Sequence, residues 1–195
     1  MGKGRLEAFS DGVFAIIITI TVLDLKIPHE GNLGALRPVL SEFLSYALSF
    51  TYVGIYWTNH HHMLQATRRV NGAVLWANLV LLFWLSLSPF VTGWLGENPD
   101  SAWPAAVYGA DFFLSGMSFF LLQRAILALE GRDSPLGRAI GTGNKEMLSQ
   151  VGYLLAIALA FVRPLFSEIL YAAVALLWIV PDRRIERQVA PGAEG

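Results

Sequence analysis

Apolar residues in this chain fall into long runs that are separated by short polar segments. The runs are about 17 to 25 residues long, which is the length an α-helix needs to cross roughly 30 Å of hydrocarbon. The pattern therefore predicts an all-α integral membrane protein with six transmembrane helices in one domain, residues 1–182. The predicted spans are 9–27, 40–63, 70–95, 103–129, 147–162 and 165–180, followed by a cytoplasmic tail at 183–195.

Two prolines predict interruptions within these apolar runs. Pro89 has no backbone N–H to donate, so we expect a kink near the outer end of the third span. The stretch from Met147 to Val180 is too long for one ordinary crossing, and Arg163-Pro164 lies near its middle. Because proline biases the residue before it away from the helical conformation, this stretch is predicted to form two short helices.

Basic residues near the span ends predict the orientation in the membrane. With the N-terminus inside, eleven lysines and arginines lie on the cytoplasmic side, and three, Lys26, Arg37 and Arg163, lie outside. The bias predicts a multi-pass protein of the cell membrane with both termini in the cytoplasm.

Composition agrees with a chain that is mostly embedded in lipid. Hydrophobic residues make up 54% of the sequence and charged residues only 15%, against about 25% charged in a soluble domain. Cysteine is absent, which excludes disulfides and thiolate metal sites. The net charge of -1 argues against nucleic acid as a partner.

Nothing in the sequence predicts an enzyme, a metal site or a bound cofactor. His60, His61 and His62 are consecutive, and consecutive residues on a helix point about 100° apart, so the three cannot converge on one ion. His29 is predicted on the opposite side of the membrane, which disfavours haem ligation by two histidines. Phosphate-binding glycine loops are also absent. We therefore expect no catalytic residues.

Ionisable residues inside the spans are candidates for function, because charge is costly in lipid. Asp11 lies near the cytoplasmic start of the first span, beside Ser10 and six residues after Arg5. The antiparallel second span brings Asn59, His60, His61 and His62 to the same depth. Such a network either locks helices together or binds an ion.

One further carboxyl residue within a span and two near the outer surface remain open in function. Asp111 lies roughly two turns into the fourth span without a predicted partner; a bound cation or proton and a hydrogen bond to a neighbouring Ser or Tyr are alternatives. Asp24 and Glu168 lie nearer the outer surface and are interpreted as solvated.

The second span carries a polar stripe, and the first carries an apolar face. Residues of the stripe recur at spacings of four and three, which is typical of close helix packing in membranes: Ser45, Ser49, Tyr52, Tyr56 and Asn59. Residues 51–56 resemble a scrambled potassium filter, but they lie mid-helix, so no re-entrant filter loop is predicted. Ile16, Thr19, Ile20 and Leu23 share one face of the first helix, a pattern also common in buried helices.

The first helix also carries a short motif with fixed spacing. Arg5-Leu6-Glu7-Ala8-Phe9-Ser10-Asp11, followed by Thr19, Leu23 and Pro28, resembles the Arg-x-x-x-Phe-Ser-Asp first-helix signature of the transmembrane protein 175 family. That family contains the lysosomal potassium channel and shorter bacterial relatives. The motif covers about the first 28 residues, and the six-span plan and total length agree with the bacterial branch.

The resemblance implies a potassium-permeable cation channel that passes monovalent cations without a cofactor. It implies a homotetramer in the lipid bilayer, with the first helix of each subunit lining the pore. Carried onto this chain, the constriction is formed by rings of Ile16, Ile20 and Leu23, with Thr19 as a nearby polar ring. The signature residues that hold the inner end of this helix are Arg5, Phe9, Ser10 and Asp11.

Two other classes of function remain as alternatives to a channel. The first is a small proton- or cation-coupled secondary transporter that uses Asp111 or Asp11. The second is a structural or assembly subunit. A channel gives unitary currents that reverse near the potassium potential, a transporter gives saturable coupled flux, and an assembly subunit gives neither.

Overall fold

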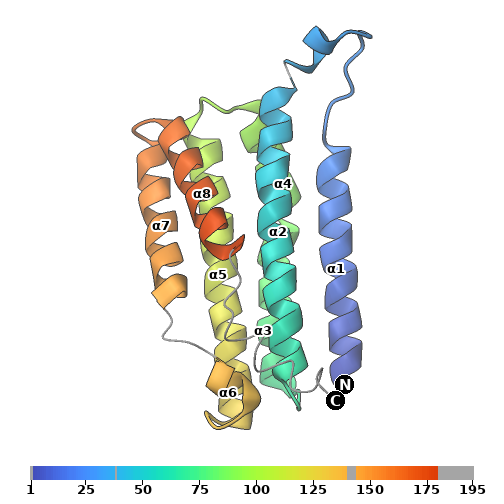
Figure 1. The fold of residues 1–195 in the computed structure, drawn as a ribbon, viewed down its shortest axis with the longest axis vertical. Coiled ribbons are helices and arrows are strands. Elements are labelled where there is room, and N and C mark those ends of the chain that lie inside the picture. Colours follow the sequence, from blue (N-terminus) through green and yellow to red (C-terminus); the bar gives the residue numbers. More distant parts are fainter. Residues whose placement is uncertain (1, 38, 140–143, 180–195) are drawn as a thin grey trace, which may run out of the picture.

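A computed structural model describes residues 2–37, 39–139 and 144–179, and within these ranges the protein is helical without β-strands (Figure 1). The elements in chain order are α1 (Lys3–Leu23), the short 3-10 helix η1 (Leu33–Leu36), α2 (Leu40–Ala66), α3 (Gly72–Ser86), α4 (Ser88–Glu97), α5 (Ala102–Glu130), α6 (Pro135–Ala139), α7 (Asn144–Ala160) and α8 (Pro164–Ile179). The predicted tail at 183–195 lies outside the described residues.

The long helices run roughly side by side in one bundle (Figure 1). α1 lies at one edge, where it contacts α2, α3 and α4, and α7 and α8 lie at the other, where they pack on each other and on α5. α5 is central, because it packs against α3, α4, α7 and α8. This arrangement leaves one side of α1 without a neighbour among the described parts of the chain.

Within the part of the chain that the structure describes, three segments are long and apolar enough to cross a membrane, judged by length and composition. They are Lys3–Leu23, Gly72–Glu97 and Ala102–Glu130. α8 is a shorter apolar helix of 16 residues. α2 has 27 residues, which is ample length, but serines, tyrosines and histidines make it more polar.

Both proline breaks occur where the sequence predicts them. α3 ends at Ser86 and α4 begins at Ser88, with Pro89 in its first turn. The missing N–H of Pro89 removes one helical hydrogen bond, and the Leu87 N–H closes the last turn of α3 on the Trp84 carbonyl at 3.0 Å. The chain breaks again between α7 and α8, immediately before Pro164. These two predictions are confirmed.

The first helix differs from its predicted limits. It begins at Lys3, before the apolar run, and ends at Leu23, four residues short of Ile27. The shorter end has two physical causes. Pro28 disfavours a helical conformation in the residue before it. Lys26 lies after the end of the helix, where its ammonium group forms ion pairs with Glu42 of α2 and Glu97 of α4.

Aromatic residues from α2, α5, α7 and α8 form one of the two buried clusters of the bundle. The Tyr52 ring stacks on Phe112 with the centroids 4.4 Å apart. Its hydroxyl donates to the Tyr171 carbonyl at 2.6 Å, and the Tyr171 hydroxyl donates to the Ala105 carbonyl at 2.9 Å. Because each hydroxyl has an acceptor, these rings are buried without an unpaired polar group.

The polar stripe on α2 packs against neighbouring helices, as predicted. Ser45, Ser49 and Tyr52 are buried. The Ser49 hydroxyl lies 2.7 Å from the Thr92 hydroxyl on α4 and 3.0 Å from the Tyr108 hydroxyl on α5. One small hydroxyl residue therefore links three helices.

Replacing Gly109 by alanine tests the close approach of α5 and α8. A Cβ at this position would overlap the buried Tyr171 hydroxyl and lie 2.9 Å from Ile157. We expect Gly109→Ala to lower the free energy of unfolding by about 1–3 kcal/mol, because the ring cannot move without losing its hydrogen bond. The measurement is the unfolding temperature in detergent. Gly54→Ala in α2 is the control, since no atom lies within 4 Å of its Cβ position.

Candidate functional site

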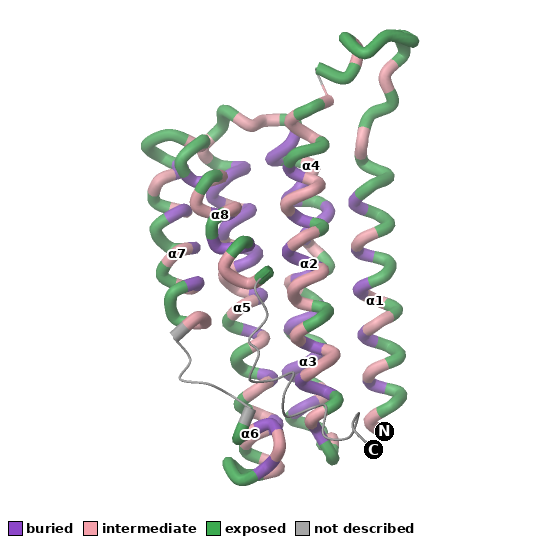
Figure 2. The backbone as a smooth tube through the Cα atoms, viewed as in Figure 1, coloured by how far each residue is buried: buried purple, intermediate pink, exposed green. Residues whose placement is uncertain are grey.

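α1 has two faces of different burial (Figure 2). The buried face points into the bundle and recurs every three or four residues: Leu6, Ser10, Phe14, Ile17 and Thr21. On the opposite side, Ile16 is 57% exposed, Ile20 is 45% exposed and Leu23 is 80% exposed. The predicted constriction residues thus share one side of the helix that none of the described residues covers.

Thr19 lies on the same exposed face, between the large aliphatic residues. Its hydroxyl donates within the helix, with the Ala15 and Ile16 carbonyls each at 3.0 Å. The donor is therefore satisfied without any neighbouring helix, while the hydroxyl oxygen remains able to accept. The face as a whole is apolar with one hydroxyl, which suits lipid, another protein surface or a narrow water path.

The inner half of α1 is attached to α2 and α3 by a buried chain of three polar side chains. The Asn78 amide nitrogen donates to the Ser10 hydroxyl at 3.0 Å. The Asn78 amide oxygen lies 2.7 Å from Nε2 of His60, and the ring nitrogen is the donor. All three residues are at most 1% exposed. Because an unpaired buried amide or hydroxyl costs free energy, these groups hold the three helices in one register.

Asp11 makes a separate contact at the surface of the bundle. Its carboxylate accepts a hydrogen bond from the Trp57 indole N–H at 2.9 Å. The Trp57 ring stacks on His61 with the centroids 5.9 Å apart, and Nε2 of His61 lies 2.8 Å from the Gln65 amide. Ser10 and Asp11 therefore reach different partners, as expected for consecutive residues about 100° apart on a helix.

The remaining predicted partners lie apart from this buried chain. Asn59 donates to the Ile55 carbonyl of its own helix, and Nδ1 of His62 is buried without a partner among the described residues. Phe9 is 49% exposed, on the open side of α1. The Arg5 side chain is exposed and pairs with no acidic group in the described ranges.

Asn78 is the residue that sequence reasoning missed. It is the only amide inside the strongly apolar α3, which is the position where a polar residue in a membrane helix usually finds a partner on a neighbouring helix. The isolated amide in this apolar sequence could have indicated that Asn78 contacts a neighbouring helix.

Asp111 lies in the interior, away from the exposed face of α1. It is 4% exposed, and the Ser88 hydroxyl donates to its Oδ2 at 3.0 Å. Its Oδ1 has no hydrogen-bond partner within the described ranges, and neither has the hydroxyl of Ser115 one turn further along α5. Across residues 2–37, 39–139 and 144–179, no group of three or more His, Asp or Glu side chains is arranged to hold a metal ion.

The chain is similar to known proteins along nearly its whole length. The model of the family described as endosomal/lysosomal potassium channel TMEM175 matches residues 5–89. A potassium channel of Chryseobacterium sp. (strain P1-3) is 49% identical over 189 residues, which cover 97% of this chain and 98% of that protein. A potassium channel of Streptomyces collinus is 36% identical over 173 residues, which cover 82% of this chain and 83% of that protein.

The fold is also similar to a solved structure. The crystal structure of a lysosomal potassium-selective channel TMEM175 homolog from Chamaesiphon minutus superposes with a TM-score of 0.79 at 27% sequence identity. The similarity covers 93% of this chain and 97% of that one.

Asn78→Ala tests the buried chain that attaches α1. The substitution removes the bridging amide and leaves the Ser10 hydroxyl and the His60 ring nitrogen buried without a partner. We expect the free energy of unfolding to fall by about 1–3 kcal/mol for each orphaned group. Thermal unfolding in detergent measures the effect. Asn59→Ala, which removes a bond only within α2, is the matched control and should change stability by less than about 0.5 kcal/mol.

Proposed function

The chain belongs to the endosomal/lysosomal potassium channel TMEM175 family, and we propose that it conducts potassium through a pore lined by α1 of each subunit. It is a membrane channel and not an enzyme. Potassium is the permeant ion, and no cofactor takes part. The observation that carries the pore assignment is the pair of opposite faces on α1, one attached to the bundle and one apolar and open.

Rings of Ile16, Ile20 and Leu23 form the constriction in this proposal. An apolar ring passes ions when it is wide enough to remain wet, and it closes by losing water when the side chains approach. Thr19 adds one ring of hydroxyl oxygens that can accept from pore water. Selectivity is weaker than in a filter of backbone carbonyls, because no matched set of oxygens replaces the hydration shell.

A homotetramer supplies the symmetry that this pore needs. One α1 at the edge of one bundle cannot enclose a channel, whereas four copies around an axis bring four open faces together. Each subunit crosses the bilayer six times, through α1, α2, the broken α3 and α4 pair, α5, α7 and α8. No re-entrant filter loop contributes, because residues 51–56 lie within α2.

Charge at the two ends of the bundle supports an orientation with both termini in the cytoplasm of a cell-membrane protein. Lys3 donates to the Gln65 carbonyl, and Glu130 accepts from the backbone N–H groups of Arg68 and Arg69, so these basic residues gather at the end where α1 begins. The opposite end carries the acidic side chains of Asp24, Glu42 and Glu97.

A coupled secondary transporter is the second candidate function. One observation favours it, namely the buried Oδ1 of Asp111, which has no donor among the described residues and is free to take a proton. Asp11 is the weaker coupling residue, because Trp57 already donates to it. Flux that saturates with substrate and is lost in Asp111→Asn would support this candidate over a channel.

Ile16→Asn tests the constriction. Four amides in a ring lower the cost of wetting the pore, so potassium current should rise several-fold and sodium permeability should increase. Single-channel recording in planar bilayers under a potassium gradient measures both quantities. Val22→Asn is the control, because Val22 is 41% exposed but lies on another side of α1.

Two outcomes would return Ile16 to the role of an ordinary packing residue. The first is an Ile16→Asn protein that assembles normally and conducts as the original chain does. The second is an equal rise in current in Val22→Asn.

Single cysteines test the orientation, since the chain has no cysteine of its own. Asp100 and Asp133 are both exposed acidic residues, one after α4 and one after α5. A membrane-impermeant maleimide added to intact cells should label Asp100→Cys and leave Asp133→Cys unlabelled until the cells are opened. Labelling of both in intact cells would contradict the proposed topology.

A further inference from the structure

A carboxyl group is buried in the interior of the bundle, where α4 packs on α5. Asp111 of α5 is 4% exposed, and Ser88 of α4, which donates to its Oδ2 at 3.0 Å, is 0% exposed. Asp111 follows Ala102, the first residue of α5, by about 14 Å along the helix axis at 1.5 Å per residue. It therefore lies within the hydrocarbon thickness of the proposed topology. The proposed pore gives this carboxyl group no role.

The two oxygens of this carboxyl group have different surroundings. Oδ2 accepts from the Ser88 hydroxyl, whereas Oδ1 is buried without a hydrogen-bond partner among the described residues. An ionised carboxylate accepts hydrogen bonds at both oxygens, whereas a protonated carboxyl group has one accepting oxygen and one O–H donor. The contacts of Asp111 therefore match the protonated group, with Oδ2 as the acceptor and Oδ1 as the hydroxyl oxygen.

Ser115 supplies an acceptor for such a hydroxyl group. It lies four residues further along α5, on the same face of the helix as Asp111. Its own hydroxyl is buried and makes no hydrogen bond within the described ranges. Other buried hydroxyl groups, such as those of Thr92 and Ser118, donate to the carbonyl four residues earlier in their own helix. Because Ser115 makes no such bond, its oxygen remains open to the Asp111 proton.

The described residues provide no positive charge to compensate an ionised Asp111. None of their ion pairs involves this residue, and α3, which packs on α5, contains no titratable side chain. The charged residues of the other helices packed on α5 lie toward the helix ends: Glu97 on α4, Lys145 and Glu146 on α7, and Glu168 on α8.

The titratable groups closest to Asp111 in the packing are phenols. Tyr56 and Tyr108 interact electrostatically with it, and Tyr153 and Tyr171 lie in the adjoining aromatic cluster. Phenols carry no charge at neutral pH. An ionised carboxylate costs far more free energy in such surroundings than a neutral carboxyl group, so burial favours the neutral form.

We propose that Asp111 is a proton-binding site, in which Oδ1 keeps a proton at neutral pH and donates it in a hydrogen bond to the Ser115 hydroxyl oxygen. Oδ2 at the same time accepts from Ser88, so the proton completes a polar contact between α4 and α5 beside the Pro89 break. A metal cation is a poorer match, because several oxygens must replace its water shell. The site offers two free side-chain oxygens among the described residues, Oδ1 and the Ser115 hydroxyl.

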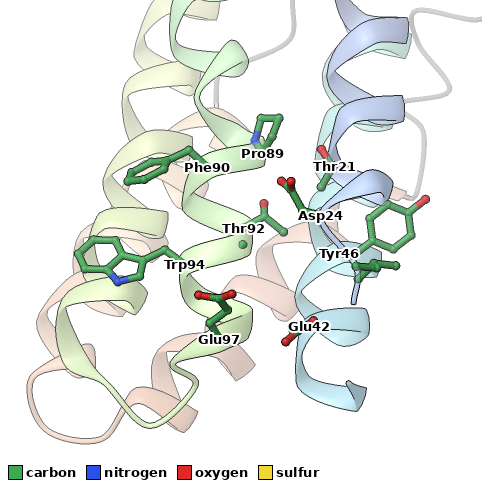
Figure 3. A pocket seen from close by; sticks show the side chains of 11 residues that line it. Thr21, Asp24, Glu42, Tyr46, Pro89, Phe90, Thr92, Trp94 and Glu97 are labelled. Carbon is green, nitrogen blue, oxygen red and sulfur yellow. The ribbon is translucent and has the colours of Figure 1, made fainter. Parts of the chain in front are cut away.

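The nearest water-filled space at the outer end of the bundle does not include this carboxyl group. A cavity of ≈ 400 Å³ reaches Pro89 and Thr92 of α4, and Asp111 is not among the residues that line it (Figure 3). The Thr92 hydroxyl donates to the Ser88 carbonyl and lies 2.7 Å from the Ser49 hydroxyl, within the bundle. We therefore expect the Asp111 proton to exchange slowly with solvent.

Infrared spectroscopy of the purified full-length chain in detergent tests the proposal. The C=O stretching band of a protonated carboxyl group is separate from the bands of carboxylates, and exposed aspartates and glutamates are ionised at neutral pH. We expect a protonated-carboxyl band in the original chain that shifts slowly after transfer to heavy water and is lost in Asp111→Asn. Asp133→Asn, at an exposed position, is the matched control and should keep the band.

Ser115→Ala tests the partner of the proton. The Asp111 O–H loses its acceptor in this variant, so the band should remain but move to higher wavenumber. Ser118→Ala is the control, because the Ser118 hydroxyl donates to the Leu114 carbonyl of its own helix, and it should leave the band in place.

The unfolding temperature in detergent, measured from mildly acid to mildly alkaline pH, gives an independent test. The folded chain holds a proton that Asp111 releases when the chain unfolds into water, so stability falls as pH rises. Asp111→Asn has no proton to release, and its amide can repeat the contacts with Ser88 and Ser115. The unfolding temperature of the original chain should therefore fall progressively below that of Asp111→Asn as pH rises.

Three outcomes would overturn the proposal. The first is the absence of a protonated-carboxyl band from the original chain at neutral pH, which decides the question even if Asp111→Asn fails to fold. The second is an unchanged band in well-folded Asp111→Asn, or an unshifted one in well-folded Ser115→Ala. The third is a constant difference in unfolding temperature between the original chain and Asp111→Asn at every pH. No measurement involves ion flux, so failure here leaves the channel proposal untouched.

Discussion

The hydrogen bonds from Ser10 through Asn78 to His60 determine which face of α1 packs against the bundle and which face stays exposed. An amide without partners costs several kcal/mol in hydrocarbon, so the three groups must meet. Their meeting fixes the rotation of α1 about its own axis. Once Ser10 faces α3, the 3.6-residue period turns Ile16 about 120° and Ile20 about 80° away from Ser10, onto the exposed side. A polar contact near the inner end thereby selects the apolar face that is left open.

The other end of α1 is held by a different kind of force. Lys26 reaches α2 and α4 through exposed ion pairs, which contribute little free energy in water and weaken with salt. The inner end is therefore attached by buried hydrogen bonds, and the outer end by ion pairs that salt weakens. Leu23, at the outer end of the open face, lies next to this more weakly attached end and is 80% exposed.

Local chemistry in the sequence predicts most of the helices and their breaks, because apolar runs and prolines act on neighbouring residues. Pro89 and Pro164 interrupt the bundle where expected. The partners of the signature residues are less predictable, since they depend on how helices rotate against one another. The depth of the residues in the membrane does not distinguish His60 from His61 and His62 as a partner. The packing of the helices brings only His60 to the buried chain and adds Asn78 from α3. The place of Arg5 in that network stays a prediction.

The buried polar groups near Asp111 link α2, α4 and α5 to one another without involving α1. Ser88 donates to Asp111 across the interface of α4 and α5, and Ser49 joins α2 to the same pair of helices. These contacts lie where the Pro89 break frees backbone groups, so they stabilise a helix pair that would otherwise be weak. Hydrogen bonds between their own side chains therefore hold α2, α4 and α5 together. In the proposed channel, the open face of α1 makes none of these polar contacts and is left for the path of the ion.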